Sequence, residues 1–353
     1  MDFGLSFLPD SNATVKSPSD YFSDAITLCI LADKCGMKTV KMTEHYLHPY
    51  GGYCPSPLMF LSAVASVTKN IRLMTGCILP AFHHPIQIAA TTSMLDALSA
   101  GRLDVGFARA YLPYEFEALN VNIDESRERF VETVSAVTKL WTTPKVSIET
   151  KFFKFHNVTN LPEVIQKPHP PVWIAAVNSR QSFSWTGEHG FGLLVTPPMS
   201  THLKEININL DIYRSSFLET PTNAHKKPRI AISLPLFIAT TSELAIKESE
   251  LYLKHYIDTW ADAADSWNSV KSNNYPGYTG MASFLRTSTP ANMRKYLRAI
   301  VGGPEEVLEQ ILYIKKLINI DQILWQIDFG GQPLQTSNRT MKLFIEHVLP
   351  YVK

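Results

Sequence analysis

Short apolar runs alternate with longer amphipathic stretches along most of this chain. Runs such as IRLMTGCIL, FGLLV and ILWQI have the continuous apolar character of strands that helices cover on one face and side chains fill on the other. Helical spacing predicts helices over 19–32 and 124–141, and proline at the first position predicts two more from Pro85 and Pro304. Eight strands are predicted, at residues 3–8, 39–43, 71–79, 103–107, 172–177, 191–195, 229–238 and 322–327.

Strands separated by helices predict βαβ units around a parallel sheet. Eight strands with intervening helices in 353 residues fit a single α/β domain over 1–353 better than they fit two domains. The predicted fold is a (β/α)₈ TIM barrel with insertions. One insertion, 143–171, is rich in Pro, Lys and aromatic residues and is predicted to be a hairpin.

A second insertion, 263–290, has little periodicity. Compact domains seldom hold more than about 15 structureless residues without a functional reason. Its aromatic residues Trp267, Tyr275 and Tyr278 favour an active-site lid, and a disordered surface loop is the alternative.

The composition of the chain limits the classes of molecule that it is expected to bind. The chain carries 33 Lys and Arg against 32 Asp and Glu, a net charge of +1 without a basic stripe, so we expect a small-molecule ligand and neither nucleic acid nor a membrane. The 4 cysteines form no CxxC pair, and an acid at position 2 does not suit a signal peptide. We therefore expect a reduced, cytoplasmic compartment.

In a (β/α)₈ barrel the site lies at the C-terminal mouth of the strands. Residues of types that can bind a metal follow the second and third strands, namely Glu44, His45, His48, His83 and His84. Their spacing matches neither HExxH nor a legible two-His-one-carboxylate set, so we expect no metal. His45 could instead simply form a hydrogen bond within a polar barrel mouth, without binding a metal. No strand is followed by GxSxG, and GxGxxG is absent after the first strand.

The fourth and fifth strand ends favour an anion. Asn178, Ser179 and Ser182 place polar side chains and free N–H groups at a helix start, where a phosphate is stabilised. Arg109, directly after the fourth strand, could reach the same anion with its guanidinium. Helix capping alone would also explain Ser179 or Ser182.

Several segments of the chain resemble the luciferase-like flavin-dependent monooxygenases, typified by the bacterial luciferase α chain. They are FGLSFLPD, TEHYLHPYGG, NIRLMTGCILPAFHHPIQIA, TSMLDALSAGRLDVGFARAYLPYEFEALNVNIDESRERF, KPHPPVWIAAVNSRQSFSWTGEHGFGLLVTP, GGPEEV and MKLFIEHVLPYV. The resemblance covers most of the chain, and the LDALSAGRLDVGFARA block is its most specific part.

The resemblance implies a (β/α)₈ barrel that binds reduced FMN from a separate flavin reductase and reacts it with O₂ to a flavin C4a-hydroperoxide. One oxygen atom then enters an apolar or carrier-bound substrate, by aldehyde oxidation, Baeyer–Villiger insertion or hydroxylation. A homodimer is implied too. Helices 57–66 and 85–98 are rich in Met, Leu, Ala and Ile and could supply an apolar interface, although ordinary helices that face the barrel would have the same composition. The alternatives are an F420-dependent dehydrogenase of the same superfamily and a non-catalytic flavin-binding subunit.

Particular residues match the family's cofactor site. Arg109 matches the arginine that binds the flavin phosphate, and Asn178, Ser179 and Ser182 fall in the segment that completes this phosphate site. Gly76 and Cys77 match a pair joined by a non-prolyl cis peptide under the isoalloxazine. In these roles Cys77 is expected to pack rather than to act as a nucleophile.

Other matches concern catalysis. His45 matches a histidine beside the reacting flavin edge and is expected to transfer protons, with Glu44 orienting it or capping the loop. Ala108 stands at a cofactor-contacting position where bacterial luciferase has cysteine, so we expect no light emission. Segment 263–290 corresponds to the mobile loop of luciferase, whose closure with Trp267, Tyr275 and Tyr278 would exclude water.

Overall fold

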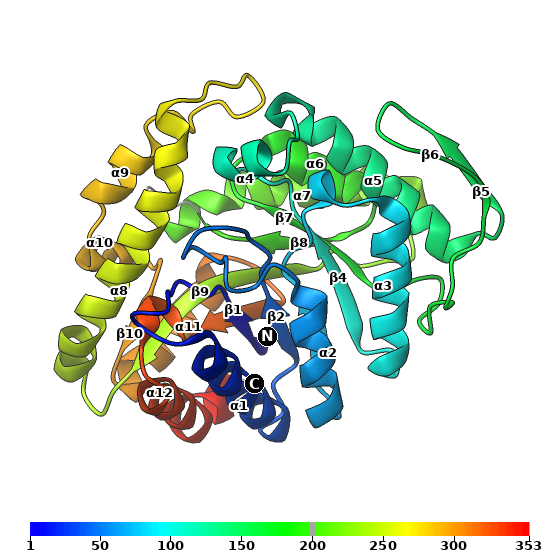
Figure 1. The fold of residues 1–353 in the computed structure, drawn as a ribbon. Coiled ribbons are helices and arrows are strands. Elements are labelled where there is room, and N and C mark those ends of the chain that lie inside the picture. The colour runs from blue at the N-terminus through cyan, green and yellow to red at the C-terminus, as the bar shows by residue number, and fades with distance from the viewer. Residues whose placement is uncertain (198–201, 353) are drawn as a thin grey trace.

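Eight parallel strands close into a barrel in the computed structural model, which describes residues 1–197 and 202–352. Their order is β9-β11-β1-β2-β3-β4-β7-β8, and β8 pairs back onto β9. The strands are β1 (Asp2–Phe7), β2 (Thr39–Met42), β3 (Arg72–Thr75), β4 (Leu103–Phe107), β7 (Val172–Ala176), β8 (Gly192–Val195), β9 (Ile230–Ile238) and β11 (Gln322–Gln326). The predicted (β/α)₈ barrel is confirmed, with strands at the centre and helices around them (Figure 1).

The helices follow the strands in the order expected of βαβ units. They are α1 (Pro18–Lys34), α2 (Pro57–Val67), α3 (Pro85–Leu98), α4 (Pro113–Ala118), α5 (Ser126–Thr142), α6 (Arg180–Glu188), α7 (Asn207–Glu219), α8 (Ser242–Ala264), α9 (Met281–Thr287), α10 (Pro290–Lys295), α11 (Pro304–Leu317), α12 (Leu334–His347) and α13 (Leu349–Val352). None of the helices that the structure describes is long and apolar enough to cross a membrane.

The eight predicted strands are all present, but two details differ. The apolar run at 71–79 is a strand only over β3, and beyond it the pairing continues only as an isolated parallel bridge between Ile78 and Phe107. A short strand that the sequence did not reveal, β10 (Ile300–Gly302), pairs in parallel with the last residues of β9.

Alternation along the strands divides the core into two parts, because successive side chains point to opposite faces. Leu73 packs in the large cluster between strands and helices, whereas its neighbour Met74 joins a separate cluster inside the barrel. Trp173 fills the same interior and lies flat against Gly192, where a Cβ atom would stand 2.5 Å from the indole. The barrel is thus filled by side chains, and ligands are confined to its mouth.

Two inserted segments extend outside the barrel. Strands β5 (Val146–Glu149) and β6 (Lys154–Val158) form an antiparallel hairpin within 143–171, which projects from the body in Figure 1. Segment 263–290 is more ordered than its lack of periodicity suggested. It contains the 3-10 turn η5 (Asp265–Asn268) and helix α9, and Figure 1 shows it rising beyond the end of α8.

Candidate active site

A buried histidine–carboxylate pair lies at the mouth. His45 follows β2, and its Nδ1 is 3.0 Å from Oε1 of Glu115, which is in the first turn of α4. Both side chains are buried, and the same carboxylate oxygen accepts the backbone N–H of Tyr46 at 2.9 Å. Gly51 makes room for this arrangement, because a Cβ atom there would stand 2.7 Å from the imidazole. Because Nδ1 is held by Glu115, Nε2 is the ring nitrogen of His45 that is left for another partner.

Glu44 contacts the loops around the mouth rather than the imidazole of His45. Its Oε1 lies 2.6 Å from Nε2 of His83 and accepts the Tyr46 hydroxyl at 2.7 Å. Burial lowers the pKa of His83, but the hydrogen bond and charge of Glu44 outweigh it and raise that pKa overall. Glu44 therefore does not orient His45, but its Oε2 accepts the backbone N–H of Leu79 at 3.4 Å, which agrees with the alternative that Glu44 caps the loop. Adjacent residues leave the strand end in different directions, and Glu115 contacts the imidazole instead.

Gly76 and Cys77 are joined by a cis peptide bond, as the family resemblance implied. The bond lies where β3 ends. Cys77 is buried in the interior cluster with Met74 and Trp173, and burial raises the pKa of its thiol to about 12. A neutral, enclosed thiol is a packing group rather than a nucleophile.

Two arginines lie near the end of β4. Arg109 follows Ala108 at the end of this strand, and Arg127 is in α5. Burial and, to a smaller extent, the charge of Arg109 lower the pKa of the Arg127 guanidinium. Among the described residues neither forms an ion pair with a carboxylate. Like charges held together without an acid suit a bound anion. Arg127 was not among the predicted site residues, although it lies in SRERF, part of a segment that resembles the family.

The helix start expected at this anion site is present. Ser179 caps α6, and its side chain accepts the backbone N–H of Ser182. Asn178 and Ser179 are exposed, and Ser182 is partly buried. The cap explains the Ser179 hydroxyl, while the free N–H groups of the first turn remain suited to a phosphate.

The segment expected to be a lid contacts the arginine. Nη2 of Arg109 donates to the carbonyl of Asn274 at 2.8 Å, and its guanidinium lies 4.1 Å above the ring of Tyr275. The Tyr275 hydroxyl donates to the carbonyl of Ala110. Trp267 lies 5.2 Å from the rings of Tyr275 and Tyr278. Of these three aromatic residues, Trp267 and Tyr275 are buried and Tyr278 is partly buried.

Aromatic rings also surround His45. Tyr50 lies 5.2 Å from the imidazole and stacks at 5.8 Å on Trp260 of α8, while Tyr111 meets the imidazole edge-on at 6.1 Å. Tyr278 lies 5.8 Å from Tyr111, so the rings around His45 continue into segment 263–290. This lining is apolar and encloses a histidine, which favours chemistry shielded from water.

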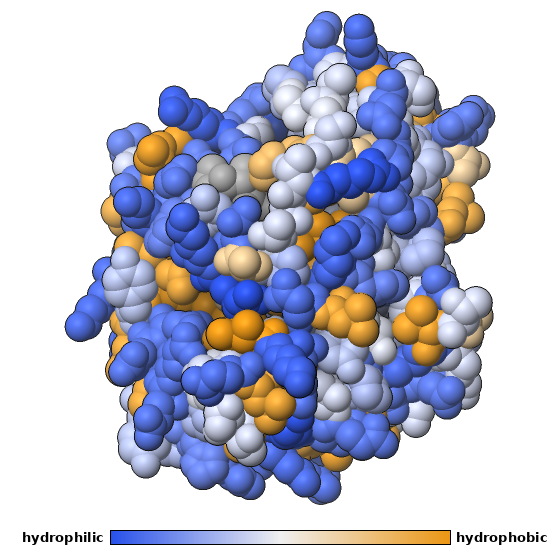
Figure 2. Space-filling view, turned by 90° about the vertical axis from the view of Figure 1, so that its left-hand side faces the viewer, coloured by the Kyte–Doolittle hydropathy of each residue, from blue (hydrophilic) through white to orange (hydrophobic). Residues whose placement is uncertain are grey.

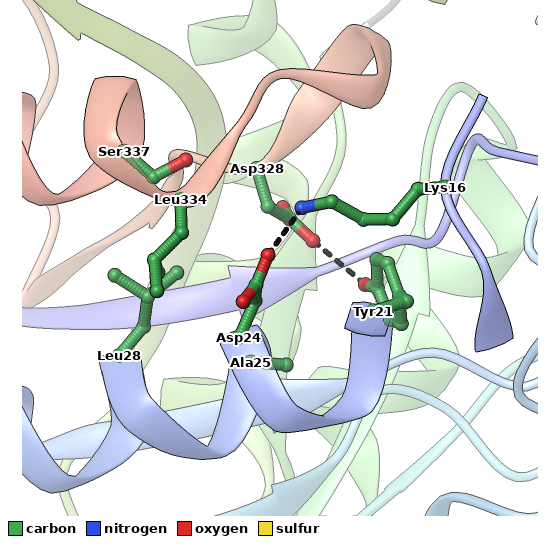
Figure 3. Close-up of a pocket in the computed structure, with 8 residues that line it drawn as sticks. All are labelled: Lys16, Tyr21, Asp24, Ala25, Leu28, Asp328, Leu334 and Ser337. Carbon is green, nitrogen blue, oxygen red and sulfur yellow. Dashed lines mark hydrogen bonds and ion pairs between the residues drawn. The ribbon is translucent and has the colours of Figure 1, made fainter. Parts of the chain in front are cut away.

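A buried carboxylate pair lies beside the mouth, between the segments that follow β1 and β11. Asp328 accepts the Tyr21 hydroxyl at 2.7 Å, and Lys16 pairs with Asp24 at 2.7 Å next to it (Figure 3). Asp10 accepts the backbone N–H of Gly330 at 2.6 Å. Burial, together with the charge of Asp328, raises the pKa of Asp10 to about 8, and burial raises that of Asp328 to about 6. The pair joins two loops, and the cavity in Figure 3, about 10 Å³, has room for a single water molecule.

Known proteins resemble this chain in sequence and in fold. The family model described as luciferase-like monooxygenase matches residues 1–318. The oxygenase component of the flavin-dependent trigonelline monooxygenase of Acinetobacter baylyi is 25% identical over 99% of this chain and 95% of its own. The solved monooxygenase RslO1 of Streptomyces bottropensis has a TM-score of 0.86 and 35% identity, with 100% of both chains covered.

A third similarity concerns the fold alone. The oxygenating constituent of the 3,6-diketocamphane monooxygenase of Pseudomonas putida, a type II Baeyer–Villiger monooxygenase solved with FMN, has a TM-score of 0.79 at 17% identity over 100% of this chain and 99% of its own. The family match spans most of the chain. The protein therefore belongs to the luciferase-like monooxygenase family and is an enzyme.

Proposed function

We propose that the protein is the oxygenase component of a two-component flavin-dependent monooxygenase. It uses O₂ and reduced FMN supplied by a separate reductase. The observation that carries this proposal is the pair Arg109 and Arg127, two neighbouring arginines without a carboxylate partner among the described residues, in the same mouth as His45. The trigonelline relative is likewise named an oxygenase component of a flavin-dependent enzyme.

The residues of the mouth fit such a cofactor. Arg109, Arg127 and the N-terminus of α6, with Asn178, Ser179 and Ser182, would hold the phosphate. Gly76, Cys77 and Ala108 lie at the neighbouring strand ends, where a flat ring needs small side chains. When bound, the reduced flavin supplies the electrons that activate O₂.

His45 is the acid–base group in this proposal. Glu115 fixes Nδ1 and so leaves Nε2 to hold or release a proton near the reacting atoms. Glu44 affects His45 only indirectly, because it binds His83 and Tyr46 rather than the imidazole of His45. Segment 263–290 excludes water, since Tyr275 and Trp267 seal the mouth beside Arg109.

The substrate proposed is an apolar or carrier-bound organic compound, oxygenated by aldehyde oxidation, Baeyer–Villiger insertion or hydroxylation. The aromatic lining around His45, formed by Tyr50, Tyr111 and Trp260, supports an apolar substrate. The related proteins are named for two different substrates, trigonelline and 3,6-diketocamphane, so the family alone does not select one.

A homodimer through α2 and α3 belongs to the same proposal. These helices pack side by side. Large apolar side chains are left exposed on them, namely Met59, Val67, Met94 and Leu98. Exposed apolar side chains on paired helices are typical of a subunit interface.

The decisive experiment is anaerobic binding of reduced FMN followed by mixing with O₂ in a stopped-flow spectrometer. The proposal predicts tight binding of reduced FMN and the absorbance of a flavin C4a-hydroperoxide. Reduction of F420 by an alcohol, without O₂, would point to the dehydrogenase alternative. Binding of flavin without any reaction with O₂ would point to a non-catalytic subunit.

A further inference from the structure

Lys41 is a lysine inside the barrel. It lies in β2 in register with Ser6 of β1 and Met74 of β3, and Met74 belongs to the interior cluster. Its exposed fraction is 6%. The side chain runs along Gly76, since a Cβ atom there would stand 2.1 Å from Cγ of Lys41, 2.4 Å from Cδ and 2.7 Å from Cε. The amine is therefore directed toward the Gly76–Cys77 bond at the mouth.

The ammonium group of Lys41 has no anion to balance it. Within the described chain, no carboxylate lies within ion-pair distance of Lys41 and no hydrogen bond from it is formed, whereas Lys16 pairs with Asp24 at 2.7 Å. Its electrostatic neighbour is the Cys77 thiol, which is neutral because burial raises its pKa. Burial lowers the pKa of Lys41 to about 8. Enclosing a charge without a partner is unfavourable.

Packing explains the stem of Lys41 but not its charge. The methylene groups fill the space that Gly76 leaves open, and methionine would fill it equally well without the desolvation cost. Unpartnered titratable groups in a barrel mouth are candidates for ligand contact. The ligand that balances Lys41 must place negative charge above β2 and β3.

A flavin phosphate cannot be that charge if Arg109 and Arg127 hold it. Arg109 follows β4, which is two strands from β2, so the two sites are separated by about 10 Å across the sheet. The sugar chain of FMN separates the phosphate from the ring by a comparable length. A cofactor anchored beside β4 would thus bring its ring near Lys41.

We propose that Lys41 is the counter-charge for the anionic, reduced isoalloxazine and that it makes the site select reduced over oxidised flavin. The inference rests on the proposed function. The reduced ring carries a negative charge at neutral pH and the oxidised ring does not, so Lys41 attracts only the reduced form electrostatically. An oxygenase with this selectivity takes the reduced cofactor from its reductase and releases the spent, oxidised one.

The test compares Lys41→Met and Lys41→Gln with wild type. Lys38→Met is the matched control, because Lys38 precedes the same strand but is exposed at its opposite end. Dissociation constants are measured for oxidised FMN in air and for dithionite-reduced FMN without oxygen. We expect wild type and Lys38→Met to prefer reduced FMN, and both Lys41 variants to lose about tenfold or more of that preference. Binding of oxidised FMN should stay the same.

Folding is monitored separately by thermal melting without ligand. Both Lys41 variants should melt at or above the wild-type temperature, since an unbalanced buried charge has been removed. An unchanged preference for reduced FMN in Lys41→Met would overturn the inference and leave the flavin site intact. If the preference is unchanged but benzoate, a carboxylate probe, binds more weakly, Lys41 serves the substrate instead. A wild type that binds neither form of FMN would overturn the proposed function and this inference together.

Discussion

Glu115 holds His45 from a position 70 residues further along the chain, with 3.0 Å between its Oε1 and the imidazole Nδ1. The second oxygen of Glu115 is buried and has no hydrogen-bond partner among the described residues. The contact engages Nδ1 and so leaves Nε2 as the ring nitrogen available to a ligand. His45 and Glu115 therefore act as a unit.

Replacing Glu115 with glutamine should lower turnover about tenfold, because the amide can keep the contact but cannot stabilise a protonated imidazole. His45→Ala should lower it by about 100-fold. The measurement is product formed and H₂O₂ released per O₂ consumed, and both variants should release more H₂O₂. Glu117→Gln is the control, since Glu117 is exposed on the same helix. If Glu115→Gln and Glu117→Gln form the same amount of product per O₂ consumed, Glu115 has no part in the mechanism.

The two arginines beside β4 make a prediction about ligand chemistry. Arg109→Ala and Arg127→Ala should each weaken FMN binding by about tenfold or more and leave riboflavin binding unchanged, because only FMN carries the phosphate. Arg129→Ala is the control, as Arg129 already pairs with Glu125 at 2.9 Å. The measurement is fluorescence quenching of the two flavins. A parallel loss of riboflavin affinity would show that the arginines support the fold rather than the phosphate.

Segment 263–290 should control leakage of peroxide. In Tyr275→Ala, the stacking on Arg109 and the bond to Ala110 are lost. We expect several-fold more H₂O₂ per O₂ consumed and faster proteolysis within 263–290. Tyr313→Ala serves as control, since Tyr313 is exposed on α11. If Tyr275→Ala releases no more H₂O₂ than this control, the segment is not a lid.

The sequence was sufficient for the barrel because its strands are continuous apolar runs that alternate with helices. It failed where structure depends on contacts distant in sequence. β10 has only three residues and forms by pairing with the end of β9. Segment 263–290 is polar on average, yet Trp267 and Tyr275 are buried against residues near 110 and 124.

The site residues, too, divide into those that local sequence predicts and those that depend on contacts distant in sequence. Arg109 and His45 could be predicted because each lies within three residues of the end of a strand, and strand ends define the mouth. Glu115 and Arg127 lie on helices beyond the strand ends. The segment SRERF, which resembles the family, contains Arg127, but no local pattern assigns either residue to the site. Lys41 was counted within an apolar strand, and its burial becomes visible only when the barrel closes.

The exposed apolar side chains of α2 and α3 should mediate dimerisation. The double variant Met59→Lys with Met94→Lys should be monomeric, because two buried ammonium groups would face the partner subunit. Light scattering after size exclusion gives the mass. Leu251→Lys is the control, since Leu251 is equally exposed on α8. Figure 2 shows the side of the molecule to which α8 belongs, where hydrophobic and hydrophilic side chains are interspersed. A dimer that survives the double substitution would place the interface elsewhere.

The buried pair Asp10 and Asp328 predicts that stability falls as pH rises. Asp10 has a pKa of about 8 in the fold and near 3.9 when unfolded, so between these values the folded state binds more protons than the unfolded state. The free energy of unfolding should therefore decrease from pH 5 to pH 8, by about 4 kcal/mol from Asp10.

Asp10→Asn keeps an oxygen for the Gly330 N–H and removes the charge, so it should raise stability at pH 8 and flatten the pH dependence. Urea unfolding at several pH values measures this. Asp2→Asn is the control because Asp2 is exposed. Curves for wild type and Asp10→Asn that stay parallel from pH 5 to pH 8 would show that Asp10 remains ionised throughout this range.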